Sequence, residues 1–63
     1  MKIKEIQDGI IKEIGYLYED DQFFTHDIHK CNDLFDLIDA LGHYGYDKQG
    51  ALGILNNVII TND

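Results

Sequence analysis

The sequence predicts an all-α fold, a small three-helix domain. Two observations carry this prediction. Apolar residues recur every three or four positions over long stretches of the chain, which is the spacing of one face of a helix. Residues that favour helix ends stand between these stretches. With 63 residues, the chain is long enough for one domain, and we treat residues 1–63 as a single small acidic domain.

The first predicted helix covers residues 2–18. Its apolar stripe advances in steps of three and four residues and consists of Ile3, Ile6, Ile10, Ile14 and Leu17, widened by Ile11 and Tyr18. Gly9 and Gly15 weaken this helix, each by about 1 kcal/mol relative to alanine. The acidic run at residues 19–21 opposes the helix macrodipole and predicts the end of the helix.

Two further helices are predicted over residues 26–41 and 48–58. Thr25 is the expected N-cap of the second, Gly42 its expected C′ residue, and Asp47 the expected cap of the third. An alternative starts the second helix with Asn32 as its cap and leaves the preceding ten residues as a loop. The three helices are expected to pack around Ile6, Ile10, Ile14, Leu17, Leu34, Ile38, Leu41, Leu52 and Leu55.

A second fold class, α+β, is the alternative. Residues 15–25 have the tyrosines and phenylalanines of a short hairpin around the acidic turn, although an isolated two-stranded hairpin is weak. Residues 57–61 are rich in β-branched side chains and are compatible with a C-terminal strand.

The net charge of the chain is concentrated in its middle. Positive and negative side chains balance in residues 1–18 and again in residues 48–63, whereas residues 19–47 hold eight acidic residues against Lys30 alone. The formal net charge of −7 therefore belongs to this central segment. Such a field attracts basic surfaces and repels nucleic acid and anionic lipid. We expect protein partners with a basic surface, with no direct nucleic acid and no membrane.

Three aspartates of this segment stand three residues apart, at Asp33, Asp36 and Asp39. Neighbours at this spacing lie roughly 5–6 Å apart on one side of a helix. Duplex DNA has one phosphate per ~3.4 Å of axis on each strand, so the row is able to imitate a phosphate backbone. The alternative is a solvated helix face that keeps a small protein soluble.

Tyrosines add a second kind of contact. Tyr44 and Tyr46 lie in a linker with few apolar neighbours, and we expect one of them to be exposed. Tyrosine is enriched at interface hot spots. The predicted partner-binding residues are therefore Glu19, Asp20, Asp21, Asp33, Asp36, Asp39, Tyr44 and Tyr46.

Catalytic and metal chemistry have little basis in this sequence. The chain has no serine for a serine nucleophile and no arginine to grip phosphate. His26, His29 and Cys31 form the cluster most compatible with zinc, but structural zinc sites need four ligands. Cys31 lies on the apolar stripe of its helix and is expected to be a core residue. We predict no enzyme activity, no cofactor and no metal, and keep a small His/Cys metal-binding protein as an alternative.

The functional prediction is a small acidic inhibitor or adaptor that binds the basic, nucleic-acid-binding surface of a larger protein. In overall character the chain resembles small phage or mobile-element inhibitors, including nucleic-acid mimics and anti-CRISPR proteins. A homo-oligomeric helical module is the alternative, with the stripe of residues 2–18 and the apolar residues 58–60 buried between subunits, so a homodimer is possible. A single cysteine is typical of a reducing compartment, and we expect a cytoplasmic location.

Overall fold

The computed structural model describes residues 2–62 and confirms the all-α fold. Its elements are α1 (Ile3–Ile14), the 3₁₀ helix η1 (Gly15–Tyr18), α2 (Gln22–His29), α3 (Leu34–Gly42) and α4 (Lys48–Asn62). The two segments with strand alternatives are helical instead. Residues 15–18 form η1, and α4 continues through residues 57–61. The described part of the chain contains no strand.

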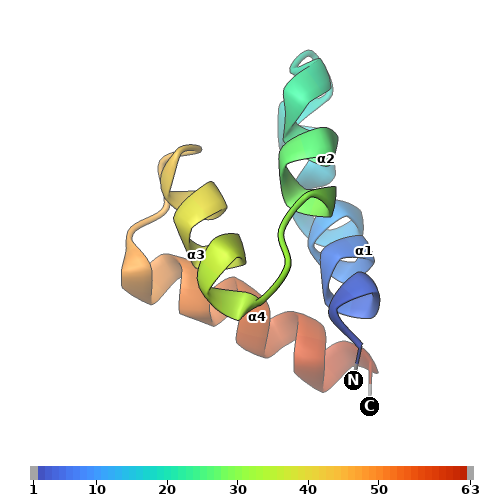
Figure 1. The fold of residues 1–63 in the computed structure, drawn as a ribbon, viewed down its shortest axis with the longest axis vertical. Coiled ribbons are helices and arrows are strands. Elements are labelled where there is room, and N and C mark those ends of the chain that lie inside the picture. Colours follow the sequence, from blue (N-terminus) through green and yellow to red (C-terminus); the bar gives the residue numbers. More distant parts are fainter. Residues whose placement is uncertain (1, 63) are drawn as a thin grey trace.

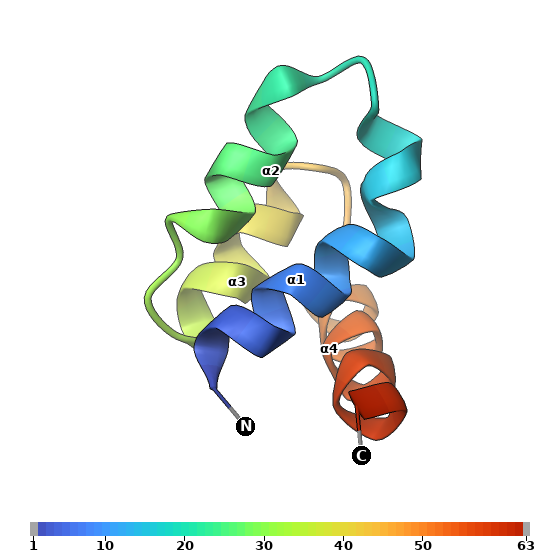
Figure 2. The same cartoon turned by 90° about the vertical axis from the view of Figure 1, so that its right-hand side faces the viewer.

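α1 packs against η1, α2 and α4. α1 and η1 run up one side of the molecule, and α2 returns antiparallel beside them (Figure 1). A short loop then leads to α3, which runs in the opposite direction to α2. α4 crosses below and packs against both α1 and α3 (Figure 2). The start of α1 and the end of α4 consequently lie at the same end of the molecule.

The predicted helix over residues 26–41 is two helices. Thr25 is not an N-cap but lies inside α2, which starts earlier, where the Asp21 carboxylate accepts a 2.9 Å hydrogen bond from the Phe23 N–H. A second start follows at Asp33, whose side chain accepts a 2.9 Å bond from the Asp36 N–H. Asp36 in turn accepts a 3.1 Å bond from the N–H of Asn32. This reciprocal arrangement is similar to a capping box and separates α3 from α2.

The first predicted helix, over residues 2–18, changes character at Gly15. Ile14 has φ −122° and ψ −2°, and the chain continues as η1. A 3₁₀ helix has three residues per turn instead of 3.6, so side chains beyond residue 14 no longer follow the stripe. Leu17, predicted to be in the core, is accordingly 56% exposed.

At the other end of the molecule, Asp47 caps α4 as predicted. Its carboxylate accepts a 2.7 Å bond from the Gly50 N–H. Gly42, expected at C′, is instead the last residue of α3, with His43 as C-cap. The left-handed position falls at Gly45, where φ is +96°, a conformation that favours glycine.

The core lies where α1, α2, α3 and α4 meet. Of the predicted core residues, Ile6, Ile10, Leu41 and Leu55 are buried, and Ile14 and Ile38 pack against them half-buried. The core prediction is wrong for Leu34 and Leu52, as it is for Leu17. Each lies on an outward face of its helix and is more than 40% exposed. Cys31 is buried as predicted. The buried hydrophobic residues that the prediction missed are Phe24, Ile28, Leu37, Ala51 and Val58.

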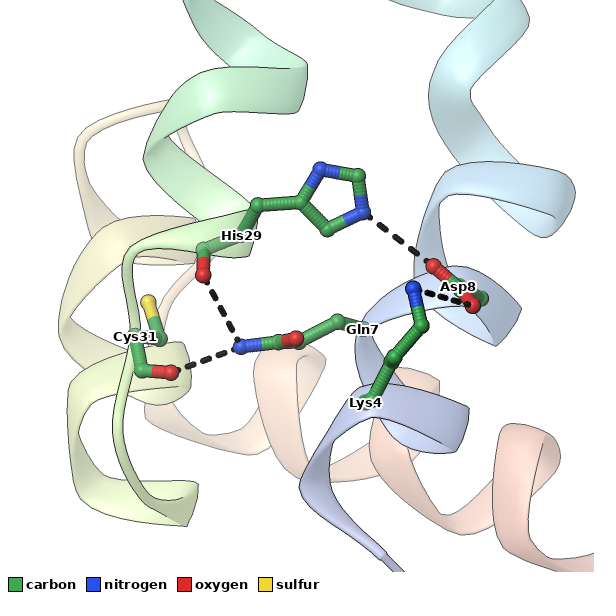
Figure 3. A network of polar contacts seen from close by, with 5 residues as sticks. All are labelled: Lys4, Gln7, Asp8, His29 and Cys31. Atoms are coloured by element: carbon green, nitrogen blue, oxygen red, sulfur yellow. Dashed lines mark hydrogen bonds and ion pairs between the residues drawn. The ribbon is translucent and has the colours of Figure 1, made fainter.

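Gln7 joins α1 to the loop between α2 and α3. Its amide nitrogen donates to the backbone oxygens of Cys31 at 2.6 Å and His29 at 3.3 Å (Figure 3). Beside it, Asp8 lies 3.1 Å from the His29 ring and 3.8 Å from Lys4. Gln7 is only 5% exposed, and these bonds satisfy its buried amide N–H group. This contact holds the end of α2 against α1.

Candidate functional site

An open groove with a volume of about 750 Å³ lies between α2 and α3. Four of the side chains along it are carboxylates and one is a lysine. We call it the acidic groove; its lining residues are Asp21, Phe23, Asp27, Lys30, Cys31, Asp36, Asp39, Ala40, His43 and Tyr44. Four negative charges face one formal positive charge, so the groove attracts cations.

Local structure explains why three of these carboxylates lie where they do. Asp21 and Asp36 take part in the capping of α2 and α3, and a negative charge at a helix N-terminus is favourable. Asp27 lies on α2 and is held by two side chains. Tyr44 donates a 2.7 Å hydrogen bond to its Oδ2 atom, and Lys30 approaches its Oδ1 atom at 3.4 Å. Asp39 is exposed and forms no hydrogen bond or ion pair within residues 2–62.

The contact with Tyr44 keeps Asp27 ionised. The Tyr44 hydroxyl, together with nearby Lys30, holds the pKa of Asp27 below its usual value of 3.8. The same hydrogen bond, with some burial, raises the pKa of Tyr44 from 10.0 to about 12. The groove therefore contains a fixed carboxylate beside a neutral phenol across the neutral pH range.

Two aromatic rings, those of Tyr18 and Phe24, hold Tyr44 in place. Tyr18 stacks on Phe24 with ring centroids 4.5 Å apart, and Tyr44 meets both rings edge-on at 5.1 and 5.0 Å. The Tyr18 hydroxyl also donates to the Tyr44 carbonyl at 3.1 Å. Aromatic pairs in such geometries contribute about 0.5–1.5 kcal/mol beyond their buried area. The cluster joins η1, α2 and the loop after α3 behind the groove.

The structure brings together four of the eight predicted partner-binding residues, namely Asp21, Asp36, Asp39 and Tyr44. Asp20 lines a neighbouring hollow of about 490 Å³ between η1 and α2, which shares Asp21 and Phe23 with the acidic groove. Glu19, Asp33 and Tyr46 line neither space. Asp33 does not continue a row with Asp36 and Asp39, because its carboxylate turns to its own helix terminus.

The expectation that Tyr44 or Tyr46 is exposed is wrong. Both are half-buried and pack against the core. The exposed aromatic residues are elsewhere: Tyr16 is 67%, Phe23 59% and Phe35 82% exposed. Sequence reasoning missed Phe23, Asp27, Lys30 and His43 as groove residues. The charged residues counted in the segment 19–47 include Asp27 and Lys30, but the count does not indicate which side chains share a face.

The structure does not assemble the predicted histidine and cysteine cluster. His29 turns its ring to Asp8 on α1, away from the Cys31 sulfur (Figure 3). Cys31 donates from Sγ to the Asp27 carbonyl at 3.2 Å, and burial raises the pKa of its thiol. Among residues 2–62, no group of three or more His, Cys, Asp or Glu side chains is placed to hold a metal ion.

Comparisons of this chain with protein-family models, with curated proteins and with solved structures gave no match. Within the described part of the chain, no helix combines the length and apolar character needed to cross a membrane.

Proposed function

We propose that this chain is a small acidic inhibitor or adaptor that binds the basic, nucleic-acid-binding surface of a larger protein. The observation that supports this most directly is the gathering of Asp21, Asp27, Asp36 and Asp39 along one open groove with Lys30 as the only lysine. Surface charges of both signs are normally interspersed. A groove with such an excess of negative charge steers a cationic partner and raises its association rate.

The class that we propose is the small inhibitor of phages and mobile elements, such as nucleic-acid mimics and anti-CRISPR proteins, acting in the cytoplasm without enzyme activity. The carboxylates of the acidic groove take the place of phosphates in the partner's cationic pockets. Because such contacts are screened at ionic strengths above the physiological range, binding weakens steeply as salt is added.

A capture experiment with competition tests this proposal. The protein is immobilised, exposed to extract of its native host, and washed with duplex DNA oligonucleotides or with salt. We expect the retained proteins to be nucleic-acid-binding proteins that duplex DNA releases. Retention of proteins that do not bind nucleic acid, or retention that excess duplex leaves unchanged, contradicts the proposal.

A matched pair of double variants shows whether the groove is responsible. Asp36→Asn with Asp39→Asn removes two charges from the groove, and the asparagine at 36 keeps an oxygen able to accept the Asn32 bond. Glu5→Gln with Glu13→Gln removes two exposed charges from α1, outside the groove. We expect only the first pair to lose capture, with equal helix content in both by circular dichroism.

The homo-oligomer alternative keeps part of its expected interface at the surface. Ile6, Ile10 and Val58 are buried within one copy of the chain, and Ile59 is half-buried. Leu17 is 56% and Ile60 62% exposed. Light scattering over a range of protein concentrations tests this alternative, and a monomer at every concentration removes it.

A further inference from the structure

Two exposed phenylalanines stand next to carboxylates of the acidic groove. Phe23, near the start of α2, lines the groove and is 59% exposed, and its N–H is bonded to the Asp21 carboxylate. Phe35, near the start of α3, does not line the groove but is 82% exposed. With 3.6 residues per turn, the groove residues Asp39 and Asp36 lie about 40° and about 100° from Phe35 around the helix axis. An exposed aromatic ring therefore accompanies groove carboxylates on both helices.

Phe23 and Phe35 stand near the starts of helices that run in opposite directions. α2 and α3 are antiparallel (Figure 1), so these two starts lie toward opposite ends of the helix pair. With eight and nine residues, these helices are about 12–14 Å long. An extended peptide covers that length with about four residues.

We propose that the acidic groove accepts an arginine-bearing segment of the partner protein, with guanidinium groups that stack on Phe23 and Phe35 and donate to Asp21, Asp36 and Asp39. Charge complementarity selects a cationic segment, and the exposed rings select arginine. A guanidinium group is planar, stacks on aromatic faces and pairs with a carboxylate through two N–H groups, whereas a lysine ammonium is a strongly hydrated point charge. This inference rests on the proposed function, because it specifies the partner at the same groove.

Substitution of Lys30 should increase the affinity of the groove for a cationic segment. It lines the groove and is 64% exposed, with its ammonium 3.4 Å from the Asp27 carboxylate. Lys30→Gln removes the one lysine that repels an incoming cation and frees Asp27 to accept a further bond. An increase in affinity cannot come from loss of folding.

The test measures the affinities of two peptides, nona-arginine and nona-lysine, by titration calorimetry at one fixed salt concentration. We expect nona-arginine to bind several-fold more tightly. Exposed cation–π contacts contribute about 0.5–1 kcal/mol each. Phe23→Ala and Phe35→Ala should therefore each lower the affinity for nona-arginine by about two- to fivefold. Tyr16→Ala, at a 67% exposed aromatic outside the groove, is the control and should change nothing. Lys30→Gln should raise the affinity for both peptides.

Equal affinities for the two peptides overturn the inference, as does a preference for arginine that survives removal of both phenylalanines. Neither result affects the competition between duplex DNA and a captured protein. Conversely, an arginine preference that depends on Phe23 and Phe35 supports the inference even where duplex DNA releases nothing from the immobilised protein. The inference and the proposed function therefore fail separately.

Discussion

The hydroxyl of Tyr44 donates a 2.7 Å hydrogen bond to the carboxylate of Asp27, a residue 17 positions earlier in the chain. This bond joins the loop after α3 to the middle of α2 across the acidic groove. It orients the Asp27 carboxylate, one of the four in the groove. Ring contacts with Tyr18 and Phe24 hold the donor, Tyr44.

Removal of the Tyr44 hydroxyl should change the stability of the protein at acidic pH. Because the native pKa of Asp27 is lowered, ionised Asp27 contributes stability that is present above its ordinary pKa of 3.8 and is lost as the pH falls through the native value. Tyr44→Phe should move the pKa of Asp27 upward, and the stability difference from wild type should narrow below pH 3.8. Carboxyl chemical shifts followed by NMR, with urea unfolding at several pH values, measure both. An unchanged Asp27 pKa contradicts the assignment.

Alkaline pH should destabilise the protein by ionising Tyr44, the donor to Asp27. Tyr44 has its pKa raised from 10.0 to about 12, so its neutral form contributes stability that is fully present below pH 10 and is lost between pH 10 and 12. The pKa of Tyr18 is also raised to about 12, so ultraviolet absorbance should show two tyrosines that ionise late, and Tyr44→Phe should remove about half of that late change. A late change of undiminished size in the variant contradicts the assignment to Tyr44.

Asp33 should stabilise the protein through its capping hydrogen bond, and not through its negative charge. Asp33→Ala removes the acceptor for the Asp36 N–H and should cost about 1 kcal/mol, which corresponds to a fall in Tm of about 4–8 °C for a domain of this size. Asp33→Asn keeps the acceptor and should be close to neutral. Thermal unfolding of both variants checks this. Equal losses in the two variants would mean that the charge, and not the cap, is important.

Gln7 should be the most sensitive polar position of α1. Gln7→Ala leaves the carbonyls of His29 and Cys31 without their donor and should cost about 1–3 kcal/mol. Asp8→Asn, next to it, alters a contact whose partners are 53% and 44% exposed, and solvent screening should keep its effect below about 1 kcal/mol. Urea unfolding at neutral pH compares the two. A larger loss for Asp8→Asn contradicts this order.

Repulsion in the groove predicts the response to salt. Four carboxylates along one groove with one lysine repel one another, and salt screens that repulsion. Moderate salt should therefore raise the Tm of the free protein. Asp36→Asn with Asp39→Asn should reduce this dependence, and Glu5→Gln with Glu13→Gln should leave it nearly unchanged. A Tm that is flat or falls with salt in the wild type shows that the groove charges do not interact.

Prediction from sequence succeeded where a feature is local. The apolar stripe of α1 identified Ile6 and Ile10 as buried, and the Asp47 cap of α4 depends on an N–H only three residues away. It failed over residues 26–41, where one continuous apolar period hides the end of α2 and the start of α3. Asp21 and Asp33 are helix caps in the structure, but in the sequence they resemble every other aspartate of an acidic segment.

The sequence by itself determined that this protein is helical, acidic and charged mainly through residues 19–47, because periodicity and composition are properties of neighbouring residues. Only the tertiary structure decided which carboxylates share a surface. That outcome depends on the antiparallel course of α2 and α3, on Gln7 holding the end of α2 to α1, and on Tyr44 reaching Asp27. These contacts join residues 17 to 24 positions apart, so no local pattern encodes them.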